Sequence, residues 1–97
     1  MLTWFDAHDA QQFGLSLAEF FIQRIPLEGS GNTNKSKKKQ QEVLNKMLLQ
    51  VQIFKTKHKL NIYKKAKLGN ALKWRLLDAG YNPVFVDELT KELLRKL

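Results

Sequence analysis

The chain has 97 residues, a formal net charge of +8, 43% hydrophobic residues and no cysteine. This size and composition predict a single domain, 1–97, with an ordinary apolar core. The lack of cysteine excludes a disulfide scaffold, a thiolate metal site and a cysteine nucleophile. No apolar stretch approaches the roughly 20 residues of a membrane span, and the N-terminal sequence lacks the basic region of a signal peptide, so we expect a cytoplasmic protein.

A first helix is predicted over residues 6–25. Its apolar residues recur at intervals of three and four, the helical period, and they predict that this helix is the main contributor to the core. They are Ala10, Phe13, Leu17, Phe20, Phe21 and Ile25. Pro26 ends the helix because proline has no backbone N–H to donate. A flexible loop rich in Gly, Ser and Asn is predicted near 26–35, so that residues 27–39 comprise this loop and a Lys-rich junction.

A second helix is predicted over residues 36–58, with Ser36 as its N-cap. One apolar stripe runs along it from Val43 to His58. A second, weaker stripe lies roughly opposite and consists of Leu49, Ile53 and Leu60. A helix that is apolar on two sides usually lies at the centre of its bundle or at an oligomer interface.

Two further helices are predicted over residues 62–79 and 83–96. Asn61 is the expected cap of the third helix, and Gly80 suits the left-handed residue that ends it. The apolar face of this helix is predicted to consist of Ile62, Ala66, Gly69, Leu72, Leu76 and Ala79. Asn82 and Pro83 have the order of a cap and a first-turn proline. No segment has the alternation of a strand, so the chain is predicted to be an all-α, compact four-helix single domain.

Basic residues are concentrated in the middle of the chain. Residues 30–75 hold thirteen Lys or Arg against Glu42 alone, a net charge of +12, whereas residues 1–29 carry −3 and residues 76–97 carry −1. An anionic partner is therefore expected to bind this middle segment, and we expect its cations to converge on one surface. The densest run, Lys35 with Lys37 to Lys39, suits a phosphate-binding arm but is explained slightly better as a solvated junction.

The most specific binding pattern lies on the third helix. At 100° per residue, Tyr63, Lys67 and Trp74 share one stripe with Asn70. Aromatic rings interleaved with cations are typical of proteins that stack bases and hold phosphates. Because tryptophan is mostly buried in folded proteins, we expect Trp74 to belong to the core, whereas Tyr63 suits either burial or exposure.

Catalytic machinery is not expected. His8 and His58 stand fifty residues apart without the spaced partners of a metal or catalytic site. Asp6 and Asp9 are explained by the start of the first helix. The segment GSGNTNK lacks the spacing of a phosphate-binding loop, and no serine stands in a nucleophile elbow. We therefore predict a protein that is not an enzyme, with no catalytic residue, metal, cofactor or small-molecule substrate.

The segment from Arg75 to Leu89 resembles a DNA-binding helix-turn-helix in one respect. Leu76, Gly80 and Val86 have the spacing of the small residue, turn glycine and buried residue of that motif. It departs from the motif because Leu76 is large and because Asp87 and Glu88 stand where phosphates would lie. A plain corner between two helices is the better interpretation.

The leading hypothesis is a small basic protein that binds nucleic acid, DNA or RNA, through phosphate contacts from the second and third helices. The candidate residues are Lys37, Lys38, Lys39, Lys55, Lys57, Lys59, Tyr63, Lys64, Lys65, Lys67, Lys73 and Arg75. The alternative is a protein interaction module or homodimer built on the second apolar stripe, Leu49, Ile53 and Leu60. In that case the lysines would serve solubility or partner steering.

Overall fold

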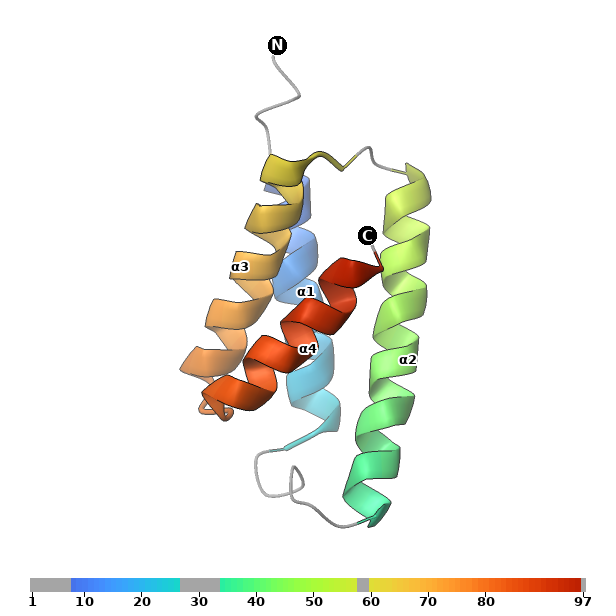
Figure 1. The fold of residues 1–97 in the computed structure, drawn as a ribbon, viewed down its shortest axis with the longest axis vertical. Helices are drawn as coiled ribbons and strands as arrows, with labels where there is room; N and C mark the ends of the chain where they lie inside the picture. The colour runs from blue at the N-terminus through green and yellow to red at the C-terminus, as the bar shows by residue number, and fades with distance from the viewer. Residues whose placement is uncertain (1–7, 27–33, 58–59, 97) are drawn as a thin grey trace.

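The computed structural model describes residues 8–26, 34–57 and 60–96, and every regular element in these ranges is an α-helix (Figure 1). The helices are α1 (His8–Arg24), α2 (Asn34–Lys57), α3 (Ile62–Asp78) and α4 (Pro83–Arg95). The predicted all-α, four-helix architecture is confirmed, and α3 and α4 begin at the predicted residues. No helix in the described ranges is both long enough and apolar enough to cross a membrane.

The boundary predicted before α2 is wrong by two residues. The helix already includes Asn34, so Ser36 lies within its first turn and is not its N-cap. The predicted loop at 26–35 is shortened accordingly, and residues 27–33 lie outside the described residues. The predicted start of the first helix at residue 6 also lies outside them.

The caps at the start of α3 and at the corner between α3 and α4 are those expected from the sequence. The Asn61 side chain accepts a hydrogen bond from the backbone N–H of Lys64 at 2.8 Å. Gly80 has φ = 103°, and the N–H groups of Gly80 and Tyr81 donate to the Leu77 and Leu76 carbonyls, which closes a Schellman motif. The Asn82 side chain accepts from two backbone N–H groups of the first turn of α4, which starts at Pro83. These caps position α4 across the end of α3.

The most intimate packing joins α1 and α3, which lie side by side and run in the same direction (Figure 1). Gly14 allows this approach, because a Cβ at that position would collide with the backbone carbonyl oxygen of Leu68 and lie 3.1 Å from the Ala71 Cβ. The two helices keep a constant register, since Glu19 meets Arg75 and Ile25 meets Tyr81, each 56 positions apart. The contact between α1 and α3 is the most extensive one between helices in the described residues.

Tyr81 fastens the corner between α3 and α4 to the end of α1. Its buried hydroxyl donates to the backbone carbonyl of Ile25, and its ring meets Phe21 edge-on, with ring centroids 5.4 Å apart. Desolvation by burial raises the pKa of Tyr81 above its ordinary value of 10.0. Tyr81 and Ile25 are 56 positions apart, and no sequence motif indicates that they are in contact.

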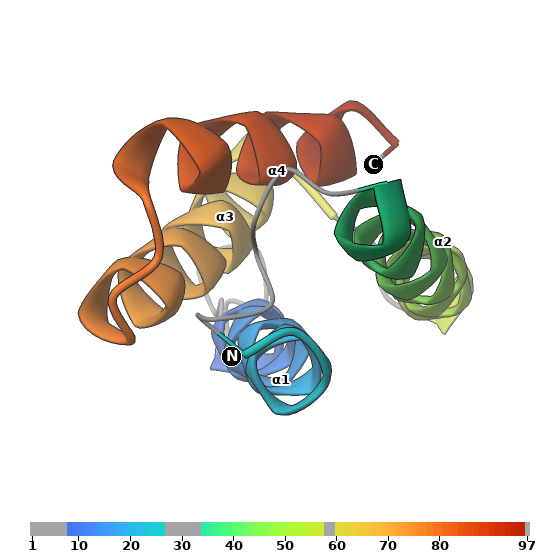
Figure 2. The ribbon, with the colours of Figure 1, turned by 90° about the horizontal axis from the view of Figure 1, so that it is seen from below.

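Helix α2 is not central, which corrects one of the two interpretations of its double apolar face. Seen along the bundle, α2 and α3 flank the core on opposite sides, while α1 and α4 lie between them (Figure 2). Val43, Met47 and Val51 are the fully buried or nearly buried residues of its inner face. The opposite face remains in solvent, so the bundle leaves Leu49 and Ile53 of the second stripe uncovered.

The core is made mostly of the predicted apolar residues, with three exceptions on α3. Trp74 was expected in the core but is 65% exposed, Ile62 is 84% exposed, and Ala66 is exposed as well. Leu72 and Leu76 are buried as predicted, together with Leu68. Trp74 lies about 160° around the axis from Leu72, so it points away from the core, and Ile62 is the first residue of the helix, where no neighbouring helix reaches it.

Candidate nucleic-acid interface

The stripe of Tyr63, Lys67, Asn70 and Trp74 lies on the outer face of α3. All four residues are exposed, with 37% of Tyr63 and 65% of Trp74 accessible to solvent. Eleven residues separate the two rings, which places them about 16 Å apart along one helix face. Exposure of both rings removes the principal objection to base stacking at this site, because a buried ring could not meet a ligand.

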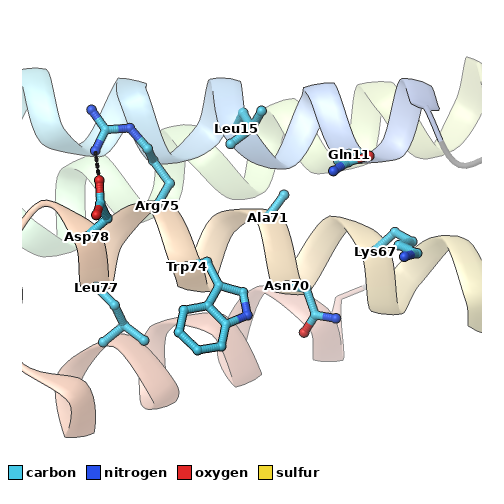
Figure 3. Close-up of a pocket in the computed structure, with 9 residues that line it drawn as sticks. All are labelled: Gln11, Leu15, Lys67, Asn70, Ala71, Trp74, Arg75, Leu77 and Asp78. Atoms are coloured by element: carbon cyan, nitrogen blue, oxygen red, sulfur yellow. Dashed lines mark ion pairs between the residues drawn. The ribbon is translucent and has the colours of Figure 1, made fainter.

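A hollow of about 720 Å³ opens beside Trp74, between α1 and α3 (Figure 3). Gln11 and Leu15 of α1 form one wall, and Lys67, Asn70 and Trp74 of α3 form the other. Ala71 and Arg75 point toward α1, while the Trp74 indole points away from it. The hollow therefore combines a flat aromatic surface, apolar carbon and two side-chain amides that can each donate and accept hydrogen bonds.

Several cations of α3 are available beside this stripe. The Lys67 ammonium lies 5.6 Å from the centre of the Tyr63 ring, within the range of a cation–π contact. Lys64, Lys65 and Lys73 form no ion pair with any residue in the described ranges. Their stems are half-buried along the helix, which holds their charges near the surface of α3.

Arg75 is held differently from these lysines. Its Nε lies 2.6 Å from Glu19 Oε1, across the α1–α3 contact, and its Nη1 lies 3.9 Å from Asp78 Oδ2. Two carboxylates therefore compensate its charge. Sequence periodicity placed Arg75 beside the cationic stripe, whereas the fold turns it into a bridge between helices.

The remaining candidate lysines divide between the two ends of α2. Lys55 and Lys57 lie at the end from which the chain passes to α3, and the Lys55 ammonium is 3.5 Å from the Lys96 carbonyl oxygen (Figure 1). Lys37, Lys38 and Lys39 lie in the first turns of the helix, with Lys38 roughly 28 Å from Lys57 along the axis. That distance is about three Debye lengths at physiological salt. The cations expected on one surface are thus divided between the outer face of α3 and the two ends of α2, and Lys59 lies outside the described residues.

The alternative interface on α2 keeps two of its three predicted residues. Leu49 and Ile53, one turn apart, are 62% and 49% exposed. Leu60 instead packs against the core and is not part of that surface. A shallow hollow adjoins Ile53, lined by Phe13, Gln50, Phe54 and Lys57, in which the Phe13 and Phe54 rings stack with centroids 4.2 Å apart.

Sequence reasoning missed the contribution of α1 to the hollow beside Trp74. Gln11 and Leu15 carry no motif, and only the register of the α1–α3 packing brings them opposite Asn70 and Ala71. It also missed Asp78, whose carboxylate lies at the far end of the hollow from Lys67. Among the described residues, no three His, Asp or Glu side chains gather as a metal site would require.

No protein-family model, curated protein or solved structure matches this chain.

Proposed function

We propose that this chain is a small, non-enzymatic, cytoplasmic protein that binds nucleic acid through the outer face of α3. Lys64, Lys65 and Lys67 contact phosphates. Lys55 and Lys57 add positive charge at the end of α2 from which the chain passes to α3. Tyr63 and Trp74 supply flat surfaces for bases. Phosphate contacts release condensed counterions, so binding of this kind is strong at low salt and weakens steeply as salt increases.

The exposed Trp74, aligned with Tyr63 and Lys67, is the observation that carries this proposal. Burying a large side chain of this kind would stabilise the protein by several kcal/mol (about 3), so its exposure forgoes a substantial contribution. Aromatic and cationic side chains on one face are the combination found in single-strand grooves and stacking platforms. The unpaired lysines beside it supply the phosphate contacts that stacking alone would lack.

The proposal is tested with matched charge changes at the two ends of the basic segment. Anisotropy of a fluorescein-labelled 12-nucleotide oligonucleotide is titrated at salt concentrations between roughly 50 and 200 mM. Lys64→Gln with Lys67→Gln should weaken binding and reduce the slope of log K against log salt by about 0.7 per lysine for a single strand. Lys38→Gln with Lys39→Gln removes the same charge at the far end of α2 and serves as the control.

Two results would count against nucleic-acid binding at α3. One is the absence of salt-dependent binding by the unaltered protein at about 50 mM salt. The other is an equal loss of affinity in both double variants, because that would mean that only the total charge matters.

A second candidate function is a homodimer formed through α2, supported by the solvent-exposed Leu49 and Ile53. Sedimentation at several concentrations tests it, with Leu49→Lys as the disrupting change. Val84→Lys on α4 is the control, since Val84 is also exposed, at 66%. A concentration-dependent dimer that Leu49→Lys abolishes and Val84→Lys preserves supports this candidate, whereas a monomer at every concentration rejects it.

A further inference from the structure

The hollow between α1 and α3 has two chemically different ends. Lys67 lies at one end, near the start of α3, and the Asp78 carboxylate lies at the other (Figure 3). Between them, the Trp74 ring and the Asn70 amide stand on the same side of α3. Arg75 also lies at the Asp78 end, but Glu19 and Asp78 compensate its charge, so a phosphate is favoured at the Lys67 end. The middle of the hollow suits an uncharged part of a ligand with a flat face and a polar edge.

From this arrangement we infer that the ligand is a single-stranded nucleic acid and that one of its bases stacks on Trp74 with its edge toward Asn70. The inference rests on the proposed function, because it names the class of nucleic acid that the α3 face takes. Lys67, two turns from Trp74, holds a phosphate on the side of the strand that leads toward Tyr63. The strand therefore runs along α3 between the two rings.

A duplex does not suit this face. Its bases are stacked on one another, so their flat surfaces are covered and only their edges are reachable from the grooves. A Trp side chain has one N–H donor and no acceptor, which makes it a poor reader of base edges. Its large flat surface gains most from an unstacked base, and the Asn70 amide can then pair with the exposed edge of that base.

The experiment compares three 12-unit probes by anisotropy at one low salt concentration: oligo-dT, an abasic strand with the same phosphates, and a blunt duplex. We expect oligo-dT to bind most tightly. Trp74→Ala should weaken oligo-dT binding about 5- to 150-fold, the effect typical of losing one stacked base. The same change should leave the abasic strand and the duplex unaffected, and Trp74→Phe, which keeps a ring, should recover most of the lost affinity.

The result separates the inference from the proposed function. Equal affinity for oligo-dT and duplex, or an equal effect of Trp74→Ala on oligo-dT and the abasic strand, overturns the single-strand inference while salt-dependent phosphate binding stands. Failure of all three probes to bind rejects the proposed function itself. Circular dichroism of Trp74→Ala checks that the helices are retained.

The placement of the strand beside Trp74 is tested separately. Asp78→Asn removes a carboxylate from the end of the hollow and should tighten oligo-dT binding more than Glu42→Gln, which removes one from the exposed face of α2. Equal effects of the two changes would contradict the placement of the strand beside Trp74.

Discussion

Helices α2 and α3 carry most of the lysines of this chain, but they are held in different ways. α3 lies against α1 along its length and meets α4 on its other side, where Gly69 faces the Leu94 side chain. α2 flanks the core and packs on one side only. The helix with close neighbours on two sides exposes a narrow polar and aromatic stripe, whereas the helix with one covered side exposes leucine and isoleucine.

The two helices also differ in the size of the side chains at their contacts. Gly14 and Ala71 let the backbones of α1 and α3 approach closely, which holds the α3 surface in one register. The contacts of α2 are made by larger side chains, including the stacked Phe13 and Phe54 rings. We therefore place the ligand site on the closely packed helices α1 and α3, and the candidate dimer surface on α2.

The largest effect is expected from emptying the core side of α3. Leu72→Ala removes a fully buried side chain and should lower the free energy of unfolding by about 2–5 kcal/mol. Leu49→Ala on the exposed face of α2 should change it by less than about 0.5 kcal/mol. Urea unfolding followed by circular dichroism measures both, and similar losses in the two variants would mean that α2 buries Leu49 in solution.

A smaller effect is expected from widening the α1–α3 contact. Gly14→Ala pushes a Cβ into the Leu68 carbonyl, which the backbone cannot evade, so it should destabilise the protein by about 1–3 kcal/mol. Gly69→Ala is the matched control, because its Cβ would meet only the movable Leu94 side chain at 2.9 Å. There the gain in helix propensity, about 1 kcal/mol, should offset most of the strain. Equal unfolding midpoints for both variants would contradict the close packing of α1 on α3.

The hydrogen bond from the Tyr81 hydroxyl to the Ile25 carbonyl should contribute about 1 kcal/mol to the free energy of unfolding. Tyr81→Phe should remove this contribution, because the carbonyl then loses its donor. Burial raises the pKa of Tyr81 in the folded protein. Its contribution is therefore complete below pH 10, and it declines as the pH rises further, since the unfolded chain then releases a proton that the folded protein retains. Denaturation between pH 8 and about 11 should show the two proteins converging in stability, and parallel curves would contradict this.

The smallest effect concerns the Glu19–Arg75 bridge. Both side chains are partly exposed, at 44% and 34%, so Glu19→Gln should cost no more than about 0.5–1 kcal/mol. It also releases Arg75 next to the hollow beside Trp74, so we expect oligo-dT binding to tighten by a few-fold. Unfolding and anisotropy measured on one preparation test both effects, with Asp87→Asn on α4 as the control for the change in net charge.

Local features of the fold were predictable because they depend on neighbouring residues. Each helix cap uses contacts only a few positions away, as seen at Asn61, at Gly80 and at the Asn82–Pro83 pair. The buried face of α1 followed from its period. The start of α2 was misplaced because Ser36 has the chemistry of a cap, yet the helix extends past it.

The candidate site was predictable only as a pattern. The stripe of Tyr63, Lys67 and Trp74 follows from 100° per residue, and it was identified correctly as one face of a helix. The period predicted the covered positions Gly69, Leu72 and Leu76, but it did not show that Trp74 and Ile62, which are as apolar as many core residues, remain exposed. The expectation that Trp74 is buried failed for this reason.

By itself, the sequence determined the four helices, most of their ends, and the concentration of positive charge between residues 30 and 75, because periodicity, capping and charge are properties of short stretches of chain. The parallel packing of α1 and α3 and the pairing of Glu19 with Arg75 come from the tertiary structure alone. These outcomes depend on contacts between residues more than fifty positions apart, where the shape of the packed helices selects which side chains meet and which remain in water.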